Sequence, residues 1–184
     1  MSPEEQARCL LMASFPHTKK EGETVGMGYI SPPITGCTER HLWAAMKQTI
    51  RAVASSYPAD QVRYKNKGVL TWRSLRYIGT GAHQGKTIKE NIYINEQDRS
   101  IRFVQLDDAD SETDEEVWNR ILKDDHPCLG TTSGFELVPR IEYFKCNRSK
   151  KERIPFDLPK AEAIDAIERT GDIARVIQRS YGHF

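Results

Sequence analysis

The sequence has no long run of apolar residues and almost no net charge, and each absence excludes a class of protein. Its clearest apolar piece, Cys9–Phe15, follows Glu4, Glu5 and Arg8. That piece is far shorter than the ~20 residues that span a bilayer, and it lacks the basic start of a secretory signal peptide. The net charge is only +1, so no global field attracts nucleic acid or an anionic membrane. We therefore expect a cytoplasmic protein with no membrane insertion and no nucleic-acid partner.

The sequence also lacks the spacings that mark metal, disulfide and cofactor sites. Its cysteines are scattered with no close pairs, which excludes the usual zinc signatures and a disulfide framework: Cys9, Cys37, Cys128 and Cys146. No two histidines are spaced as a metal pair, and there is no Gly-x-Ser-x-Gly elbow. The glycine-rich piece 79–85 joins two predicted strands instead of opening a helix, so it is no phosphate cradle. We expect reduced thiols, no metal and no cofactor, with 79–85 as a loop at a cavity mouth.

What is present is an ordinary globular composition. The chain has 184 residues, of which 29% are charged and 38% are hydrophobic. A single domain of this length buries close to ~70% of the surface of its unfolded chain. Ser2–Glu5 has the form of a capping box, which predicts a short helix to about Ser14, followed by a polar loop. We therefore divide the chain into an N-terminal extension, 1–22, and a main domain, 23–184.

The order of the patterned segments in the main domain is its most informative feature. Val25–Ile30 predicts a strand, and Thr38 is a good N-cap for the helix that follows. The apolar stripe of that helix recurs at helical spacing in Leu42, Ala45, Met46, Thr49, Ile50 and Val53. Five strand-like segments come next: Val62–Lys65, Val69–Ile78, Thr87–Asn95, Ile101–Leu106 and Phe135–Lys145. Their mostly short connections favour antiparallel pairing.

Two further segments complete the order. Residues 111–123 fit a helix by the spacing of Val117, Ile121 and Leu122, yet 117–121 also alternates like a strand. From Pro159 onward, near-heptad spacing predicts a helix about 33 Å long, with Gly171 on its apolar face. A glycine there indicates close backbone packing or space for a ligand. The whole order predicts an α+β fold in which a curved antiparallel sheet wraps around the C-terminal helix and leaves an internal apolar cavity.

Charge is unevenly placed along the second half of the chain. Residues 107–125 hold nine acidic side chains against Arg120 and Lys123, and residues 145–153 hold five basic side chains against Glu152. Such runs are typical of solvated loops, here near each other in space, although either run could form a surface for a partner.

The element order and several short pieces resemble one known superfamily. Tyr29–Ile34, Thr38–Trp43, Gly68–Arg73, Lys89–Ile94 and Glu116–Ile121 are similar to an uncharacterised fungal branch of the START-like (SRPBCC) superfamily, which has the helix-grip fold. Genes of that branch are associated with biosynthetic clusters. The resemblance covers about residues 23–180, and it implies that 117–123 is a strand.

The resemblance implies a small hydrophobic ligand or substrate but does not choose among functions. The first hypothesis is a cofactor-independent cyclase or isomerase acting on a polyketide- or alkaloid-like intermediate of secondary metabolism. The second is a non-catalytic carrier or sensor of a lipid or metabolite, and the third is an interaction module that uses the acidic run. Exposed edge strands would also allow a homodimer, although nothing in the sequence requires one.

Glu90 and Arg76 are the candidate catalytic residues. Glu90 shares one face of its strand with Ile88, Ile92 and Ile94, so a buried apolar face would carry a carboxylate. Such a group is either a general base or half of an ion pair. Both faces of Val69–Ile78 are mixed, and if its even positions point inward, Arg76 supplies a cation for a ligand anion.

Other candidate ligand contacts follow from the same strand periodicity. On that even face, Trp72 would form an apolar wall. The remaining candidates are apolar or hydrogen-bonding positions expected to face the cavity: Tyr29, Ile92, Phe103, Gln105, Tyr143 and Gly171. Gln105 could orient a ligand carbonyl, and the tyrosines could donate phenolic hydrogen bonds. Convergent polar groups in the cavity would favour catalysis, whereas a wholly apolar lining would favour a carrier.

Overall fold

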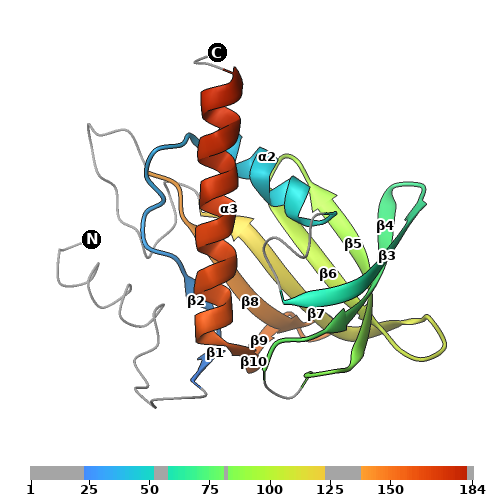
Figure 1. The fold of residues 1–184 in the computed structure, drawn as a ribbon. Coiled ribbons are helices and arrows are strands. Elements are labelled where there is room, and N and C mark those ends of the chain that lie inside the picture. The colour runs from blue at the N-terminus through green and yellow to red at the C-terminus, as the bar shows by residue number, and fades with distance from the viewer. Residues whose placement is uncertain (1–22, 52–57, 81–82, 123–137, 182–184) are drawn as a thin grey trace.

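The computed structural model describes residues 23–51, 58–80, 83–122 and 138–181. These ranges form one large antiparallel sheet, a two-stranded ladder and two helices. In Figure 1 the C-terminal helix α3 (Lys160–Tyr181) lies across the front of the sheet, and α2 (Glu39–Thr49) lies beside it. The predicted α+β class, with a large antiparallel sheet and a C-terminal helix, is confirmed. The predicted helix near residues 3–14 lies outside the described residues.

Both predicted helices of the main domain are present. Thr38 caps α2, because its side-chain oxygen accepts a hydrogen bond from the backbone N–H of His41. The predicted stripe of α2 is buried at Leu42, Ala45 and Met46. Helix α3 starts one residue after Pro159.

The large sheet has the strand order β2-β8-β7-β6-β5-β4-β3, with β9 paired to β8. Its strands are β2 (Tyr29–Ile30), β3 (Ala59–Lys67), β4 (Leu70–Tyr77), β5 (Thr87–Asn95), β6 (Ser100–Leu106), β7 (Glu112–Ile121), β8 (Ile141–Asn147) and β9 (Glu152–Ile154). The separate ladder pairs β1 (Thr24–Gly26) with β10 (Phe156–Pro159). All these pairs are antiparallel, as the short connections predicted.

Three strand predictions need correction. The single strand over Val25–Ile30 is wrong, because a turn with positive φ at Gly26 (59°) and Gly28 (145°) divides it between two sheets. The helical interpretation of 111–123 is wrong for residues 112–121, which form β7. Strand β8 begins at Ile141, whereas the start predicted at Phe135 lies outside the described residues, and the strands β9 and β10 were not predicted.

The core lies between one face of the sheet and the two helices. Buried side chains from β5 to β8 pack there against α2 and against Ile167 and Ala174 of α3. We call this face of the sheet the inner face. Its cross-strand register places Arg73, Glu90 and Gln105 in one row across β4, β5 and β6. A row of polar residues therefore runs across an otherwise apolar face.

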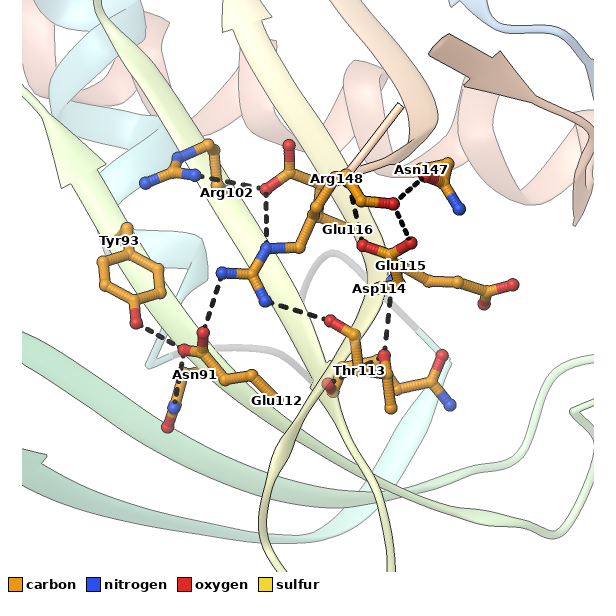
Figure 2. A network of polar contacts seen from close by, with 12 residues as sticks. Asn91, Tyr93, Arg102, Glu112, Thr113, Asp114, Glu115, Glu116, Asn147 and Arg148 are labelled. Carbon is orange, nitrogen blue, oxygen red and sulfur yellow. Dashed lines mark hydrogen bonds and ion pairs between the residues drawn. The ribbon is translucent and has the colours of Figure 1, made fainter. Parts of the chain in front are cut away.

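The opposite, outer face of the sheet joins the acidic and basic runs of the sequence. Figure 2 shows Arg148 among the acidic side chains of β7: its Nη2 lies 2.9 Å from Glu112 Oε2, and its Nη1 donates to the Thr113 carbonyl oxygen at 3.0 Å. Glu116 contacts Arg102 Nη1 at 3.2 Å. Where the structure describes them, the two runs do lie together, and much of them is strand and not loop. Lys145 and Arg148 of the basic run pair with glutamates of the acidic run.

Two further findings concern the described residues alone. No helix among them has the length and apolar character needed to cross a membrane. Cys37 and Cys146, the cysteines within these ranges, are both free thiols.

Candidate functional site

A cavity of about 140 Å³ lies against the inner face of the sheet, beside the start of α3. Strands β4 to β8 contribute its floor, and β10, the β4–β5 loop and the last turn of α2 contribute its walls. The apolar part of the lining consists of Leu75, Ile88, Phe103, Val117, Phe156, Leu158 and Ala166. Charged and amide side chains line the rest, so the lining is not wholly apolar.

The first polar feature is a buried ion pair between Arg73 and Glu90. Arg73 donates from Nε and Nη2 to the same carboxylate oxygen of Glu90, at 2.8 and 2.5 Å, and both residues are over 90% buried. The guanidinium also donates to the carbonyl oxygen of Ile50 at the end of α2 and lies 4.9 Å from the ring centroid of Phe103. Arg73 thus ties three elements together, which is a structural role.

Two more charged pairs lie at the edges of the cavity. Lys145 on β8 contacts Glu115 on β7 at 2.6 Å, and its side chain is largely buried. His83 Nε2, in the β4–β5 loop, lies 3.3 Å from the Asp157 carboxylate on β10. The Lys145–Glu115 pair neutralises its charge within the protein.

Among the described lining residues, Glu162 is the one with a buried side-chain oxygen that has no hydrogen-bond partner. It lies in the first turn of α3, and its Oε1 accepts hydrogen bonds from Thr80 N at 2.7 Å and from Thr80 Oγ1 at 3.1 Å. Its other oxygen, Oε2, is buried and has no hydrogen-bond partner among the described residues. Burial raises the pKa of this carboxyl, although the backbone hydrogen bond from Thr80 opposes the shift. A cavity carboxyl of this kind is typical of a general acid or base.

The position of Glu162 depends on Gly79. A Cβ atom on Gly79 would lie only 2.5 Å from Glu162 Oε1 and would also collide with the Tyr77 hydroxyl. We therefore expect Gly79→Ala to lower the free energy of unfolding by about 1–3 kcal/mol, because it overpacks this contact. Thermal unfolding followed by circular dichroism measures the change.

The control for that variant is Gly68→Ala. A Cβ on Gly68 meets nothing within 4 Å, so its cost comes only from a positive φ of 64°. A melting temperature of Gly79→Ala equal to that of the wild type would show that the loop does not pack on Glu162 as described.

Neutral polar groups complete the lining. Tyr143 hydrogen-bonds with Thr170 of α3, and burial raises the pKa of its hydroxyl. Gln105 and Asn119 line the cavity from β6 and β7. Of the two, Gln105 was predicted from the strand periodicity, and Asn119 was not.

The structure separates the predicted catalytic residues. Glu90 lines the cavity, as the apolar face of its strand predicted, but Arg76 does not. Arg76 binds Asp60 on the edge strand β3, with Nε–Oδ1 at 2.8 Å. The assumption that the even positions of β4 point inward is wrong, because the buried positions are Arg73, Leu75 and Tyr77. Arg76 and Trp72 both lie on the other face.

The remaining predicted contacts fall into three groups. Phe103, Gln105 and Tyr143 line the cavity. Ile92 is only 1% exposed and belongs to the core, outside the cavity lining. Tyr29 and Gly171 line a different hollow between the proline-rich segment and α3. A Cβ on Gly171 would lie 3.2 Å from Ile34, so this glycine allows close packing.

Sequence reasoning missed Glu162, Arg73, Asn119 and Lys145. An acidic residue soon after Pro159 looks like a partner of the helix dipole, and nothing local signals that it reaches a loop 82 positions away. For Arg73 the sequence held a signal, because Arg73 shares the odd-numbered face of its strand with Leu75 and Tyr77. The even-numbered face, however, mixes apolar and polar residues to the same extent, so the sequence could not choose between the two faces.

Comparisons with known proteins add no assignment. A search against models of protein families gives no match, and a search among curated proteins gives none either. Within the described residues, no group of three or more potential ligand side chains could hold a metal ion. The family resemblance therefore stays a prediction that rests on the residues quoted for it.

Proposed function

We propose that this chain is a helix-grip enzyme without a cofactor, which binds a small, largely apolar molecule in the cavity and cyclises or isomerises it by proton transfer. The observation that carries the proposal is Glu162, a residue of the cavity lining whose carboxyl oxygen Oε2 is buried and has no hydrogen-bond partner among the described residues. Burying such an oxygen costs free energy, and a hydrogen bond from a bound ligand would offset that cost.

The reaction needs only one group that exchanges a proton. Glu162 would take a proton from a carbon next to a ligand carbonyl, and the electron pair of that C–H bond would move onto the carbonyl oxygen. Where a carbon–carbon double bond adjoins the enolate, return of the same proton to the far carbon of that double bond gives an isomer. Attack of the enolate carbon on a second carbonyl in the same molecule closes a ring instead, and the alkoxide that forms takes the proton back from Glu162. In both cases the carboxylate is regenerated, so no oxidant or reductant is needed.

Glu90 has a different role in this proposal from the one the sequence suggested. Arg73 binds one of its carboxylate oxygens twice, and the pair is buried. We assign Glu90 to holding Arg73, and thereby the cavity floor, and we assign the proton transfer to Glu162. The anion-stabilising role predicted for Arg76 has no place here, because Arg76 lies on the outer face.

A specific observation also favours the second candidate, a carrier. The cavity charges other than Glu162 are paired with protein groups, as in Arg73–Glu90 and Lys145–Glu115. A lining of satisfied polar groups can hold a ligand without reacting with it. The two candidates share the ligand and differ only in whether Glu162 moves a proton.

Ligand capture followed by isotope exchange distinguishes them. We expect the freshly purified full chain to retain a small molecule, visible by native mass spectrometry as a mass excess. The extracted molecule, returned to the protein in D₂O, should gain deuterium at carbon faster than it does without protein. A retained molecule that never exchanges would contradict the enzyme and support the carrier. Absence of both would contradict the two candidates together.

A further inference from the structure

The charged side chains in the described lining of the cavity are mostly paired with other protein groups. Of the cationic side chains in its lining, Arg73 is bound to Glu90 and Lys145 to Glu115. The rim histidine, His83, is next to Asp157. Glu116 contacts the cavity from β7, but its carboxylate pairs with Arg102. An anionic ligand would therefore find no unpaired cation among the described lining residues, and it would face the carboxyl of Glu162.

The hydrogen-bonding capacity that remains is mostly neutral. The side-chain amides of Gln105 and Asn119 line the cavity, and neither hydrogen-bonds to any side chain or backbone group that the structure describes. Each amide offers two N–H donors and one carbonyl acceptor. They can bind carbonyl or hydroxyl oxygens without any charge on the ligand.

The volume of the cavity limits the size of the part of a ligand that it can enclose. The cavity measures about 140 Å³. An engineered protein cavity of about 150 Å³ holds one benzene molecule. The enclosed part of a ligand is therefore of the order of one six-membered ring, in contact with apolar side chains such as Leu75, Phe103 and Val117.

We infer that the ligand of this cavity is an uncharged molecule whose enclosed part is about one ring in size and carries a carbonyl or hydroxyl oxygen held by Gln105 or by Asn119, which pairs with Ile101 four residues from Gln105. This inference rests on the proposed function, because it specifies the ligand of the same cavity. It makes the site selective against carboxylates of the same shape, although the sequence had suggested a cation for a ligand anion.

Four probes that share one aromatic ring test the inference: toluene, acetophenone, benzoate and benzylamine. Titration of the isotope-labelled full chain, followed by backbone amide chemical shifts, gives a Kd for each probe and locates it. We expect the shifts to centre on the cavity strands β5, β6 and β7. Acetophenone should bind at least tenfold more tightly than benzoate, and about fivefold more tightly than toluene for each hydrogen bond gained.

Two independent variants assign the selectivity to the amides. Gln105→Met and Asn119→Leu remove one amide each at nearly constant volume. The variant at the amide that holds the carbonyl oxygen should weaken acetophenone about fivefold while changing toluene less than about twofold. A loss of acetophenone affinity in neither variant would overturn the inference. Gln48→Met is the matched control, since Gln48 is exposed on α2 and should change neither Kd. Melting temperatures establish that each variant is folded.

The outcomes separate this inference from the proposed function. Tighter binding of benzoate or of benzylamine than of acetophenone would overturn the inference, and in the second case Glu162 would be a receptor for cations. Equal binding of all four probes would overturn it as well, while leaving a ligand cavity in place. If no probe, toluene included, shifts the cavity strands, the cavity itself fails and the proposed function fails with it.

Discussion

Replacing Arg73 by leucine is expected to lower the free energy of unfolding by about 3–5 kcal/mol, because it leaves the buried Glu90 carboxylate without its partner. The same change removes the hydrogen bond to the carbonyl oxygen of Ile50, which holds the end of α2 on the sheet. Urea denaturation followed by tryptophan fluorescence and circular dichroism measures the loss.

Two further variants show whether the loss of stability comes from the Arg73–Glu90 ion pair. The double variant Arg73→Leu with Glu90→Leu should recover most of the lost stability, since apolar side chains often replace a buried ion pair at little net cost. Arg76→Leu is the matched control on the same strand. Its partner is Asp60, and both side chains are more than a third exposed, so solvent screens the pair and the loss should be far smaller. Equal losses for Arg73→Leu and Arg76→Leu would contradict the buried-pair account.

The same experiment separates the two roles that the sequence allows for Glu90. If Glu90 holds Arg73, then Glu90→Gln should lower stability and change activity only through the fold. A Glu90→Gln variant with unchanged melting temperature but abolished turnover would instead restore Glu90 as the catalytic base.

The elements that could be predicted are those whose signal is local. Strand β5 has the predicted bounds, and α3 begins where the pattern after Pro159 predicted. Both could be predicted because the spacing of the apolar residues is visible within the segment itself. Strand β7 could not be assigned locally. Its side chains fit helical spacing, but pairing with β6 on one side and β8 on the other imposes the strand. That pairing is tertiary and overrides a weak local preference.

The candidate site was predictable only where one face of a strand is clearly apolar. The isoleucines of β5 oriented Glu90 correctly, and Phe103 oriented Gln105. On β4 both faces mix apolar and basic residues, so periodicity alone could not choose Arg73 over Arg76. The choice depends on the register that places Arg73 opposite Glu90. Glu162 reaches the cavity only through the fold, because its partner Thr80 belongs to a distant loop.

Replacing Glu162 by glutamine is expected to slow deuterium exchange into the bound ligand by about 100-fold or more, since glutamine keeps the shape and the acceptor for Thr80 but cannot take a proton. Glu168→Gln is the matched control, because Glu168 is an exposed carboxylate of the same helix that does not line this cavity. Ligand affinity of both variants should stay within about threefold of the wild type, which separates a catalytic loss from a binding loss.

The pH dependence gives Glu162 a second signature. Its pKa in the folded protein is raised above the ordinary value of 4.5 because the carboxyl is buried. A base acts only when ionised, so wild-type exchange should rise with pH through this raised pKa, and Glu162→Gln should lack the step.

Below pH 4.5 the carboxyl is protonated in both the folded and the unfolded chain, and its contribution to stability is complete. As the pH rises through the folded pKa, the unfolded chain has already released its proton, so the folded state loses stability. The melting temperature of Glu162→Gln relative to wild type should therefore increase between pH 4 and pH 8. A difference that is flat over this window, together with a pH-independent exchange rate, would show that Glu162 does not titrate as a buried base.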